Sequence, residues 1–275
     1  MQRTESRNEK TMHIDRETTA GMLRLIQDEN YNAVKAIEAA LPAIENACDQ
    51  IYERMSCGGR LIYMGAGTSG RLGVIDAVEC PPTFGVSGEV ISGIIAGGYD
   101  RMVTAAENAE DQSEAGIRDL AAKNPTPDDT ILGISVAGNA AYVADALAYA
   151  RTLGCLTIGL TSNEGSRLDR ESDISIVTDT GAEAITGSTR MKAGSAHKMV
   201  LNMISTTIMI KMGNVYQNLM INLKPTNVKL RKRVISIVCD ILHCDEETAV
   251  SQLELHHWSI RETVTAAEIA AHPQA

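Results

Sequence analysis

The sequence predicts an α/β fold in which helices cover both faces of a mostly parallel, five-stranded sheet. Three observations support this prediction. From residue 61 onward, short apolar runs of strand length alternate with stretches of helical spacing. The first of these runs leads into a glycine-rich turn. Such a turn is typical of a strand that is followed by a helix whose start binds an anion. Residues 15–57, before the first run, have apolar side chains at helical spacing. Together these features predict a three-layer α/β/α sandwich with N-terminal helices and a short C-terminal helical tail.

The segment before the sheet, residues 1–58, is expected to be an N-terminal helical region. Residues 15–57 carry apolar side chains at helical spacing in two groups, which predicts two helices. The first group is Met22, Leu23, Leu25 and Ile26, and the second is Val34, Ile37, Leu41, Ile44, Cys48 and Ile51. These stripes are expected to pack against a neighbouring layer or a second subunit.

Five apolar runs within residues 59–225 are expected to be the strands. They span residues 61–64, 90–95, 130–135, 156–160 and 174–177. Strands that are buried on both faces of a parallel sheet show this kind of continuous apolar run. Ligands of such sheets bind beyond the carboxyl ends of the strands, which is where the glycine-rich turn at residues 65–70 falls.

The rest of the chain is expected to be helical. Residues 187–212 predict one long helix that begins through Gly187 and ends at Gly213, a suitable C-cap. Its apolar stripe, expected in the core, is Met199, Val200, Met203, Ile204 and Ile208. Residues 226–275 then predict a helical tail with a polar end at residues 272–275.

Composition excludes several classes of function. The 275 residues are 44% hydrophobic, enough for one large domain with helical additions. A formal charge of −10 without a long basic run argues against binding to nucleic acid or an anionic membrane surface. No apolar stretch reaches the length of a membrane span, and the six cysteines show no repeated CxxC spacing. We therefore expect a cytoplasmic protein with reduced thiols.

The turn at residues 65–70 predicts a site for a phosphorylated small molecule. Glycines allow a sharp turn, and Gly67, Thr68 and Ser69 stand where a helix begins with free N–H groups. The same glycines match the dinucleotide fingerprint. That fingerprint requires an acidic residue after the second strand, whereas Glu89 precedes the second apolar run. No nicotinamide or other cofactor is expected.

Two glutamates are candidates for chemistry, each with a plainer alternative. Glu79 is expected at the junction between a helix over residues 70–78 and a loop stiffened by Pro81 and Pro82. Glu110 is expected to share a helix face with Glu107 and Glu114, and residue spacing alone favours an exposed acidic surface.

Four basic residues and several Cys and His residues are further candidates for a binding site. The four basic residues beside glycine-, serine- or threonine-rich turns are candidates for neutralising an anion, and each can equally be a solvated surface residue. They are Arg71, Arg190, Lys192 and Lys198. The tail carries Cys239, His243 and Cys244 and the pair His256-His257, but not at a structural-zinc spacing. No metal site is expected, and no motif marks a nucleophilic serine or cysteine.

Several long motifs resemble one family. They lie at residues 4–8, 61–74, 79–84, 95–98, 107–111, 186–194 and 198–203. The pattern from residue 4 to about residue 235 resembles the N-acetylmuramic acid 6-phosphate etherases, a branch of the sugar isomerase (SIS) domain superfamily. The resemblance implies an SIS-type sandwich, a homodimer with sites near the subunit interface, and a C-terminal tail that is a truncated UBA-like module.

The resemblance also implies an activity. It is the cofactor-free cleavage of the D-lactyl ether of N-acetylmuramic acid 6-phosphate to N-acetylglucosamine 6-phosphate and D-lactate, in cell-wall sugar recycling. Base removes the C2 proton of the open-chain aldehyde, lactate leaves from C3, and water adds back, which requires a general acid and a general base. Glu79 matches the family's acid position and Glu110 its base position. The substrate-binding residues that the resemblance implies are Gly67, Thr68, Ser69, Gly138, Asn139, Ser188, Thr189 and Lys192.

The chain departs from the family pattern at residues 137–141. The family usually has Ser-Gly-Arg-Thr-Pro there as a second phosphate-binding loop, and this chain has Ala-Gly-Asn-Ala-Ala. Two hydroxyls and a guanidinium are therefore missing, which predicts weaker phosphate binding or a different substrate. His197 stands where the family more often has Gln. A sugar-phosphate-binding regulator with little catalysis is the main alternative, and an aldose–ketose isomerase on the same fold is a third possibility.

Overall fold

The computed structural model describes residues 3–104, 108–223, 225 and 227–271. The chain divides into two compact units. The first comprises residues 1–77 with 89–208, and the second comprises residues 78–88 with 209–275. The domain boundaries expected after residues 58 and 225 stay predictions. Glu107 and the polar end at residues 272–275 lie outside the described residues.

The first unit is built on a five-stranded sheet that confirms the predicted strands. The strands are β1 (Leu61–Gly65), β2 (Ile91–Ile95), β3 (Thr130–Ile134), β4 (Leu156–Thr161) and β5 (Ile174–Val177). All are parallel, in the order β2-β1-β3-β4-β5. Gly65 at the end of β1 is level with Ile95 of β2 and Ile134 of β3. The segments that follow these strands therefore emerge together at one edge of the sheet.

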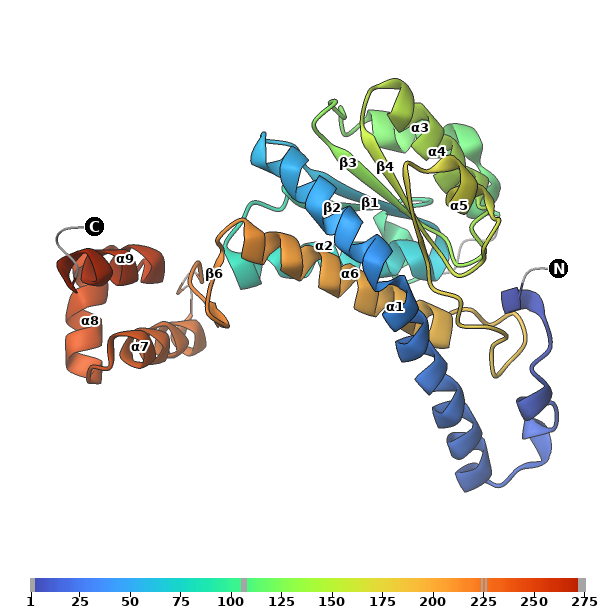
Figure 1. The fold of residues 1–275 in the computed structure, drawn as a ribbon, viewed down its shortest axis with the longest axis horizontal. Coiled ribbons are helices and arrows are strands. Elements are labelled where there is room, and N and C mark those ends of the chain that lie inside the picture. The colour runs from blue at the N-terminus through green and yellow to red at the C-terminus, as the bar shows by residue number, and fades with distance from the viewer. Residues whose placement is uncertain (1–2, 105–107, 224, 226, 272–275) are drawn as a thin grey trace. The chain divides into compact units, whose positions relative to one another are not determined.

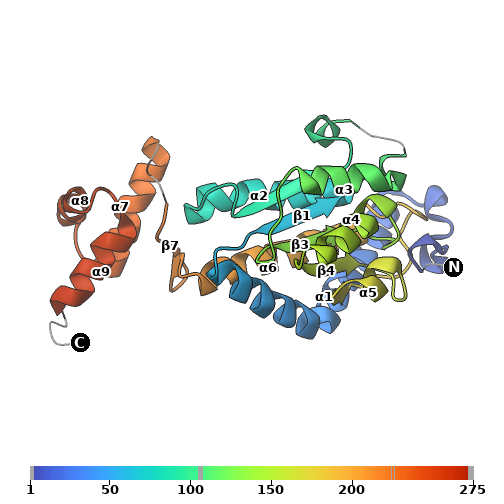
Figure 2. The same cartoon turned by 90° about the horizontal axis from the view of Figure 1, so that it is seen from above.

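Helices cover both faces of the sheet, as the three-layer prediction requires (Figure 1). One face carries α3 (Ser113–Ala121), α4 (Ala141–Thr152) and α5 (Arg167–Glu171), and the other carries α1 (Thr19–Ser56), α2 (Gly67–Phe84) and α6 (Lys192–Lys211). The same arrangement can be followed from above in Figure 2.

The side chains that pack between the sheet and its helices differ on the two faces. On the α4 face, Ile62 and Met64 join a core that includes Tyr142. On the other face the Tyr63 hydroxyl donates to the Asp76 carboxylate of α2 at 2.9 Å. Burial raises the pKa of Asp76, and hydrogen bonds from Tyr63 and from two side chains of α6 act in the opposite direction.

Helix α1 is a single helix of 38 residues, so the prediction of two helices was wrong. Its N-cap is Thr18, whose hydroxyl accepts the N–H of Gly21 at 3.1 Å. The two apolar stripes are joined through Glu29, which is only 4% exposed. Its carboxylate forms an ion pair with the Lys192 ammonium of α6. Glu29 is therefore buried although it is a polar residue between two apolar stripes, because the ammonium of Lys192 pairs with it.

Helix α2 continues past residue 78 to Phe84, which corrects the expected junction at Glu79. Pro81 and Pro82 lie in its last turn and have no N–H, so the carbonyls of Ala77 and Val78 receive no donor from within the helix. The Thr83 hydroxyl donates to the Glu79 carbonyl at 2.7 Å. Gly85, at φ +69°, then ends the helix. Glu79 is therefore a helical residue with an exposed side chain.

Helix α6 begins at Lys192, five residues later than expected, and the chain turns at Gly213 as predicted. Gly187 has φ +75°, which a helix does not accommodate. The Glu183 carboxylate accepts the N–H groups of Lys192 at 3.3 Å and Ala193 at 2.9 Å. This carboxylate fixes the start of the helix, because it satisfies donors that have no partner within the helix.

The second unit contains the helical tail that the sequence predicts. Its helices are α7 (Val228–Leu242), α8 (Glu246–Leu255) and α9 (Ile260–Ala271), and a short hairpin of β6 (Val215–Tyr216) and β7 (Leu219–Met220) precedes them. The three helices share a core of their own around Val234, Val238 and Leu253. The Arg231 guanidinium lies 4.0 Å from the ring centre of Trp258. Among the described residues, no helix has the length and apolarity needed to cross a membrane.

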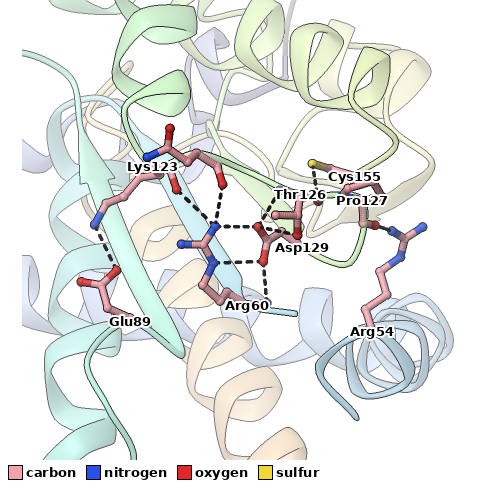
Figure 3. A network of polar contacts seen from close by, with 9 residues as sticks. Arg54, Arg60, Glu89, Lys123, Thr126, Pro127, Asp129 and Cys155 are labelled. Carbon is pink, nitrogen blue, oxygen red and sulfur yellow. Dashed lines mark hydrogen bonds and ion pairs between the residues drawn. The ribbon is translucent and has the colours of Figure 1, made fainter. Parts of the chain in front are cut away.

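An ion-pair network ties together the amino-terminal ends of the strands (Figure 3). Arg60, just before β1, donates to both oxygens of Asp129, just before β3, at 3.1 and 2.7 Å. Burial acts to raise the pKa of Asp129, but hydrogen bonds from Arg60 and Thr126 outweigh it, so the pKa is lowered. Arg54 of α1 donates to the Gly154 carbonyl at 3.1 Å. This network holds the end of the sheet opposite the segments described next.

Candidate active site

A cavity of about 170 Å³ lies at the carboxyl edge of the sheet, where the sequence predicts a ligand site. Its walls come from the segments after β1 and β3, from a turn before α3 and from the segment that leads into α6. The lining residues are Ala66, Gly67, Thr68, Ser69, Glu110, Ile134, Ser135, Val136, Ala137, Ala140, Thr189 and Gly194.

The β1–α2 turn has a backbone that only glycines allow. A Cβ on Gly65 would lie 2.5 Å from the nitrogen of Gly70, and one on Gly70 would lie 2.5 Å from the oxygen of Gly65. Gly67 has φ +53° and starts α2. The turn therefore brings the first N–H groups of an 18-residue helix, with Thr68 and Ser69, to the cavity wall. Such a helix start binds phosphate or another anion.

The loop after β3 keeps a tight turn although its family hydroxyls are missing. Gly138 has φ +73°, and its N–H donates to the Ser135 hydroxyl at 3.1 Å. The Asn139 side-chain oxygen accepts the N–H of Arg167 at 3.0 Å, so it is used within the fold. Ala140 is the N-cap of α4 and provides no side-chain cap. Ser135 lines the cavity and was not predicted as a site residue, although its place as the last, polar residue of the expected strand at residues 130–135 was the available signal.

Glu110 lines the cavity with Thr68 and Ser69 and is exposed, as residue spacing predicted, but it does not share a helix with Glu114. Glu110 belongs to a 3-10 turn, η5 (Ala109–Asp111), whereas Glu114 belongs to α3. Gln112 separates them with φ −87° and ψ 83°, which is not helical. The break in the helix places Glu110 in a separate turn that lines the cavity and not on the face of α3.

A second, adjoining cavity of about 290 Å³ shares Thr68 and Gly194 with the first. Arg190 and Lys198 line it and supply positive charge beside the anion-binding turn. The Arg71 side chain is used within the fold, because its guanidinium donates to the carbonyls of Met102 at 3.1 Å and Thr104 at 2.8 Å. Arg190 and Lys198 are therefore the candidate cations that line this second cavity, and Arg71 is not among them.

The structure does not bring every predicted site residue to this cavity. Gly138, Asn139 and Ser188 neighbour lining residues in sequence without lining it themselves, as far as the described residues show. Lys192 is 2% exposed and faces Glu29 in a different cavity. Glu79 lies on the exposed side of α2, within the segment that belongs to the second unit.

His197 lies within α6 and is fully buried. Its Nε2 is 3.2 Å from the Ser162 hydroxyl. Burial lowers the pKa of His197 to about 4, against the opposing effect of the Thr161 backbone. The ring is therefore neutral at physiological pH. Within the described residues, no group of three or more His, Cys, Asp or Glu side chains could hold a metal ion.

Comparisons with known proteins agree with this fold. Residues 43–151 match the glucokinase regulatory protein N-terminal SIS domain, and residues 103–209 match the SIS domain. A phosphoheptose isomerase from Francisella tularensis superposes with a TM-score of 0.54 at 19% identity, over 70% of this chain and 98% of that chain. The phosphoheptose isomerase of Neisseria gonorrhoeae gives a TM-score of 0.51 at 18% identity, over 70% and 98%. Fold and family matches define an SIS-domain protein.

Curated relatives narrow the class. The N-acetylmuramic acid 6-phosphate etherase of Clostridium beijerinckii is 49% identical over 94% of this chain and 85% of the relative. The Bacillus subtilis etherase is 50% identical over 92% and 84%, and a Yersinia pestis etherase is 48% identical over 94% and 86%. The chain belongs to the N-acetylmuramic acid 6-phosphate etherase family.

Proposed function

We propose that this chain cleaves the D-lactyl ether of N-acetylmuramic acid 6-phosphate by elimination and hydration, giving N-acetylglucosamine 6-phosphate and D-lactate. One observation carries the proposal beyond family membership. Glu110 and the anion-binding turn at residues 67–69 line one cavity. A base and a phosphate site within the reach of one sugar are what the reaction requires.

The chemistry assigns a role to each group. Glu110 takes the C2 proton of the open-chain aldehyde, which is acidic because it lies next to the carbonyl. The C3–O bond then breaks, lactate leaves, and water adds to the resulting unsaturated aldehyde. General base catalysis of this kind typically contributes about 10²- to 10⁴-fold. The phosphate, held at the α2 start, contributes binding energy that orients the sugar.

Glu79 is proposed as the general acid that protonates the leaving oxygen. This role rests on the family resemblance at residues 79–84, since Glu79 does not line the cavity. An alkoxide is a poor leaving group, so a proton donor is needed at C3. Glu79 is exposed and therefore accessible for that task.

Phosphate binding is proposed to use Thr68, Ser69 and Thr189, with Arg190 and Lys198 supplying charge. The loop at residues 137–141 contributes no side-chain hydroxyl or cation, because Ala137 and Ala140, which line the cavity, have no polar side-chain atoms. Each lost polar contact weakens binding by about 1–3 kcal/mol. We therefore expect an elevated KM for the phosphorylated sugar and no loss of the reaction itself.

Lactate release from N-acetylmuramic acid 6-phosphate tests the proposal. Wild type is compared with Glu110→Gln, Glu79→Gln and the matched control Glu114→Gln, a carboxylate of α3 that does not line the cavity. Release that is lost in the first two variants and retained in the control supports the etherase. A folded wild type that releases no lactate at saturating substrate overturns it.

The regulator and isomerase alternatives give different results in the same experiment. A regulator would bind sugar phosphate, release no lactate and keep its affinity when Glu110 or Glu79 is changed to Gln. An isomerase would interconvert an aldose and a ketose phosphate without forming lactate. The curated relatives described above carry the etherase name, which favours the enzyme.

We also propose a homodimer, supported by an exposed apolar stripe on α1. Leu23, Val34 and Leu41 are 63, 57 and 43% exposed, and spacings of 11 and 18 residues place them on one face of the helix. Light scattering should give the mass of two chains for wild type. Leu23→Glu with Val34→Glu should give one chain, whereas a monomeric wild type would contradict the proposal.

The proposed pathway and cellular location follow from the proposed etherase activity. We propose that the chain acts in cell-wall sugar recycling in the cytoplasm. The six cysteines are free thiols, which suits a reducing compartment. Fractionation of the native host, with lactate release measured in each fraction, tests this location.

A further inference from the structure

A second polar cavity lies away from the candidate active site, within the first unit. It has a volume of about 610 Å³, and its walls come from the N-terminal arm, α1, the segment after β5 and the start of α6. Its lining residues include Arg7, Lys35, Lys192, Glu29, Thr180 and Gly181. None of them lines the cavity that holds Glu110.

The lining is predominantly cationic. It contains the basic residues Arg3, Arg7, Lys10, Lys35 and Lys192 and the acidic residues Glu9, Glu29 and Asp179. Two pairs cancel, since Arg3 pairs with Asp179 and Lys192 pairs with Glu29. Arg7 and Lys35 have no ion-pair partner among the described residues. An excess of positive charge at a concave surface attracts an anion.

The walls of this cavity are held in place by the fold. The Asn8 side chain donates to the Ala182 carbonyl at 3.1 Å, and the Thr11 hydroxyl donates to the Ala184 carbonyl at 2.8 Å. These bonds attach the N-terminal arm to the segment after β5, 174 and 173 residues away along the chain. The cations of the arm are thereby presented on an ordered wall.

A buried polar group at this site is left without a partner. Thr180 lines the cavity and is 3% exposed, and its hydroxyl forms no hydrogen bond with any described residue. Its oxygen is closed off from the cavity, so the exposed cations are the groups that a ligand can reach.

The space fits a small polar molecule. Small-molecule sites commonly have volumes of about 300–1,000 Å³. Gly181 has φ +72°, and a Cβ placed on it would meet no atom within 4 Å, so the wall is open there. Ala36 and Ala39 line the α1 side of the cavity, and their small side chains take up little of its space. The apolar lining is limited to such small residues, so a polar ligand suits the cavity better than a hydrophobic one.

We propose that this cavity binds a small organic phosphate, of the size of a sugar phosphate, at a site separate from the candidate active site. The Arg7 guanidinium offers a forked pair of donors and Lys35 offers an ammonium, which together match a phosphate dianion. The site does not depend on the etherase reaction, because neither Arg7 nor Lys35 lines the cavity that contains Glu110.

Calorimetric titration with glucose 6-phosphate, with inorganic phosphate and with uncharged glucose as the control ligand tests this site. The test variant is Arg7→Gln with Lys35→Gln. The matched control is Lys229→Gln with Lys232→Gln, which removes the same charge from exposed positions of α7. A Ser69→Ala variant marks binding at the candidate active site. Melting temperatures without ligand confirm that each variant is folded.

The expected result is a glucose 6-phosphate site that weakens about tenfold for each lost charged contact in the Arg7/Lys35 variant. It should persist in the Lys229/Lys232 control and in Ser69→Ala, and glucose should not bind. Equal weakening in both double variants, or a single site that Ser69→Ala removes, overturns the proposal.

Discussion

The buried His197 makes stability depend on pH in a way that one substitution removes. The ring is 0% exposed and its Nε2 lies 3.2 Å from the Ser162 hydroxyl, which is itself 3.1 Å from the Thr178 hydroxyl. Burial lowers the pKa of His197 from its ordinary value of 6.5 to about 4. Protonation of this ring in the folded state is therefore costly.

The sign and size of the effect follow from proton linkage. Below pH 6.5 the unfolded chain binds a proton at His197, and the folded chain does not until about pH 4. This contribution to stability is therefore fully present above pH 6.5 and is lost as the pH falls toward 4. At about 1.4 kcal/mol per pKa unit, the loss reaches about 2 kcal/mol at pH 5 and about 3 kcal/mol below pH 4.

Urea unfolding at pH 7.5 and pH 5 measures this loss. His197→Gln carries the residue that the family more often has, and it should lose about 2 kcal/mol less than wild type between the two pH values. His13→Gln, an exposed histidine, serves as the control and should behave like wild type. Equal losses in wild type and His197→Gln would refute the reasoning, because the ring would then not be held neutral by burial.

Three further substitutions test other parts of the fold. Asp129→Ala removes the carboxylate that pairs with Arg60 and should lower the free energy of unfolding by about 3 kcal/mol in urea titrations. Ala140→Thr gives α4 the N-cap side chain that it lacks, and should raise stability by about 1 kcal/mol in the same assay. Gly70→Ala places a Cβ 2.5 Å from the Gly65 oxygen, so the turn must shift. It should lower stability by about 1–3 kcal/mol and sharply reduce lactate release, and an unchanged rate would contradict the role of this turn.

Much of the sheet could be predicted because its signals are local. Each strand is rich in apolar residues, and β1, β3 and β4 are buried at every position, as burial on both faces of a parallel sheet requires. The glycine turn after β1 is equally local, since the close approach of Gly65 and Gly70 takes place within six residues of the chain. Family membership also followed from contiguous motifs such as residues 61–74 and 79–84.

Helix ends and lengths were less predictable. The two stripes of α1 join through Glu29, whose burial depends on Lys192, 163 residues away. The late start of α6 depends on the Glu183 carboxylate, which accepts its first N–H groups. Both corrections come from charged groups that meet only after the chain has folded, and periodicity does not register such partners.

The amino-acid sequence by itself determined the strands, the anion-binding turn and the family. Only the tertiary structure decided which predicted residues share a cavity. It brings Glu110 to the β1–α2 turn because the helical pattern breaks at Gln112, and it buries Lys192 against Glu29 in another cavity. The physical reason is that local chemistry sets each element, whereas convergence of side chains depends on how parallel strands align their carboxyl ends.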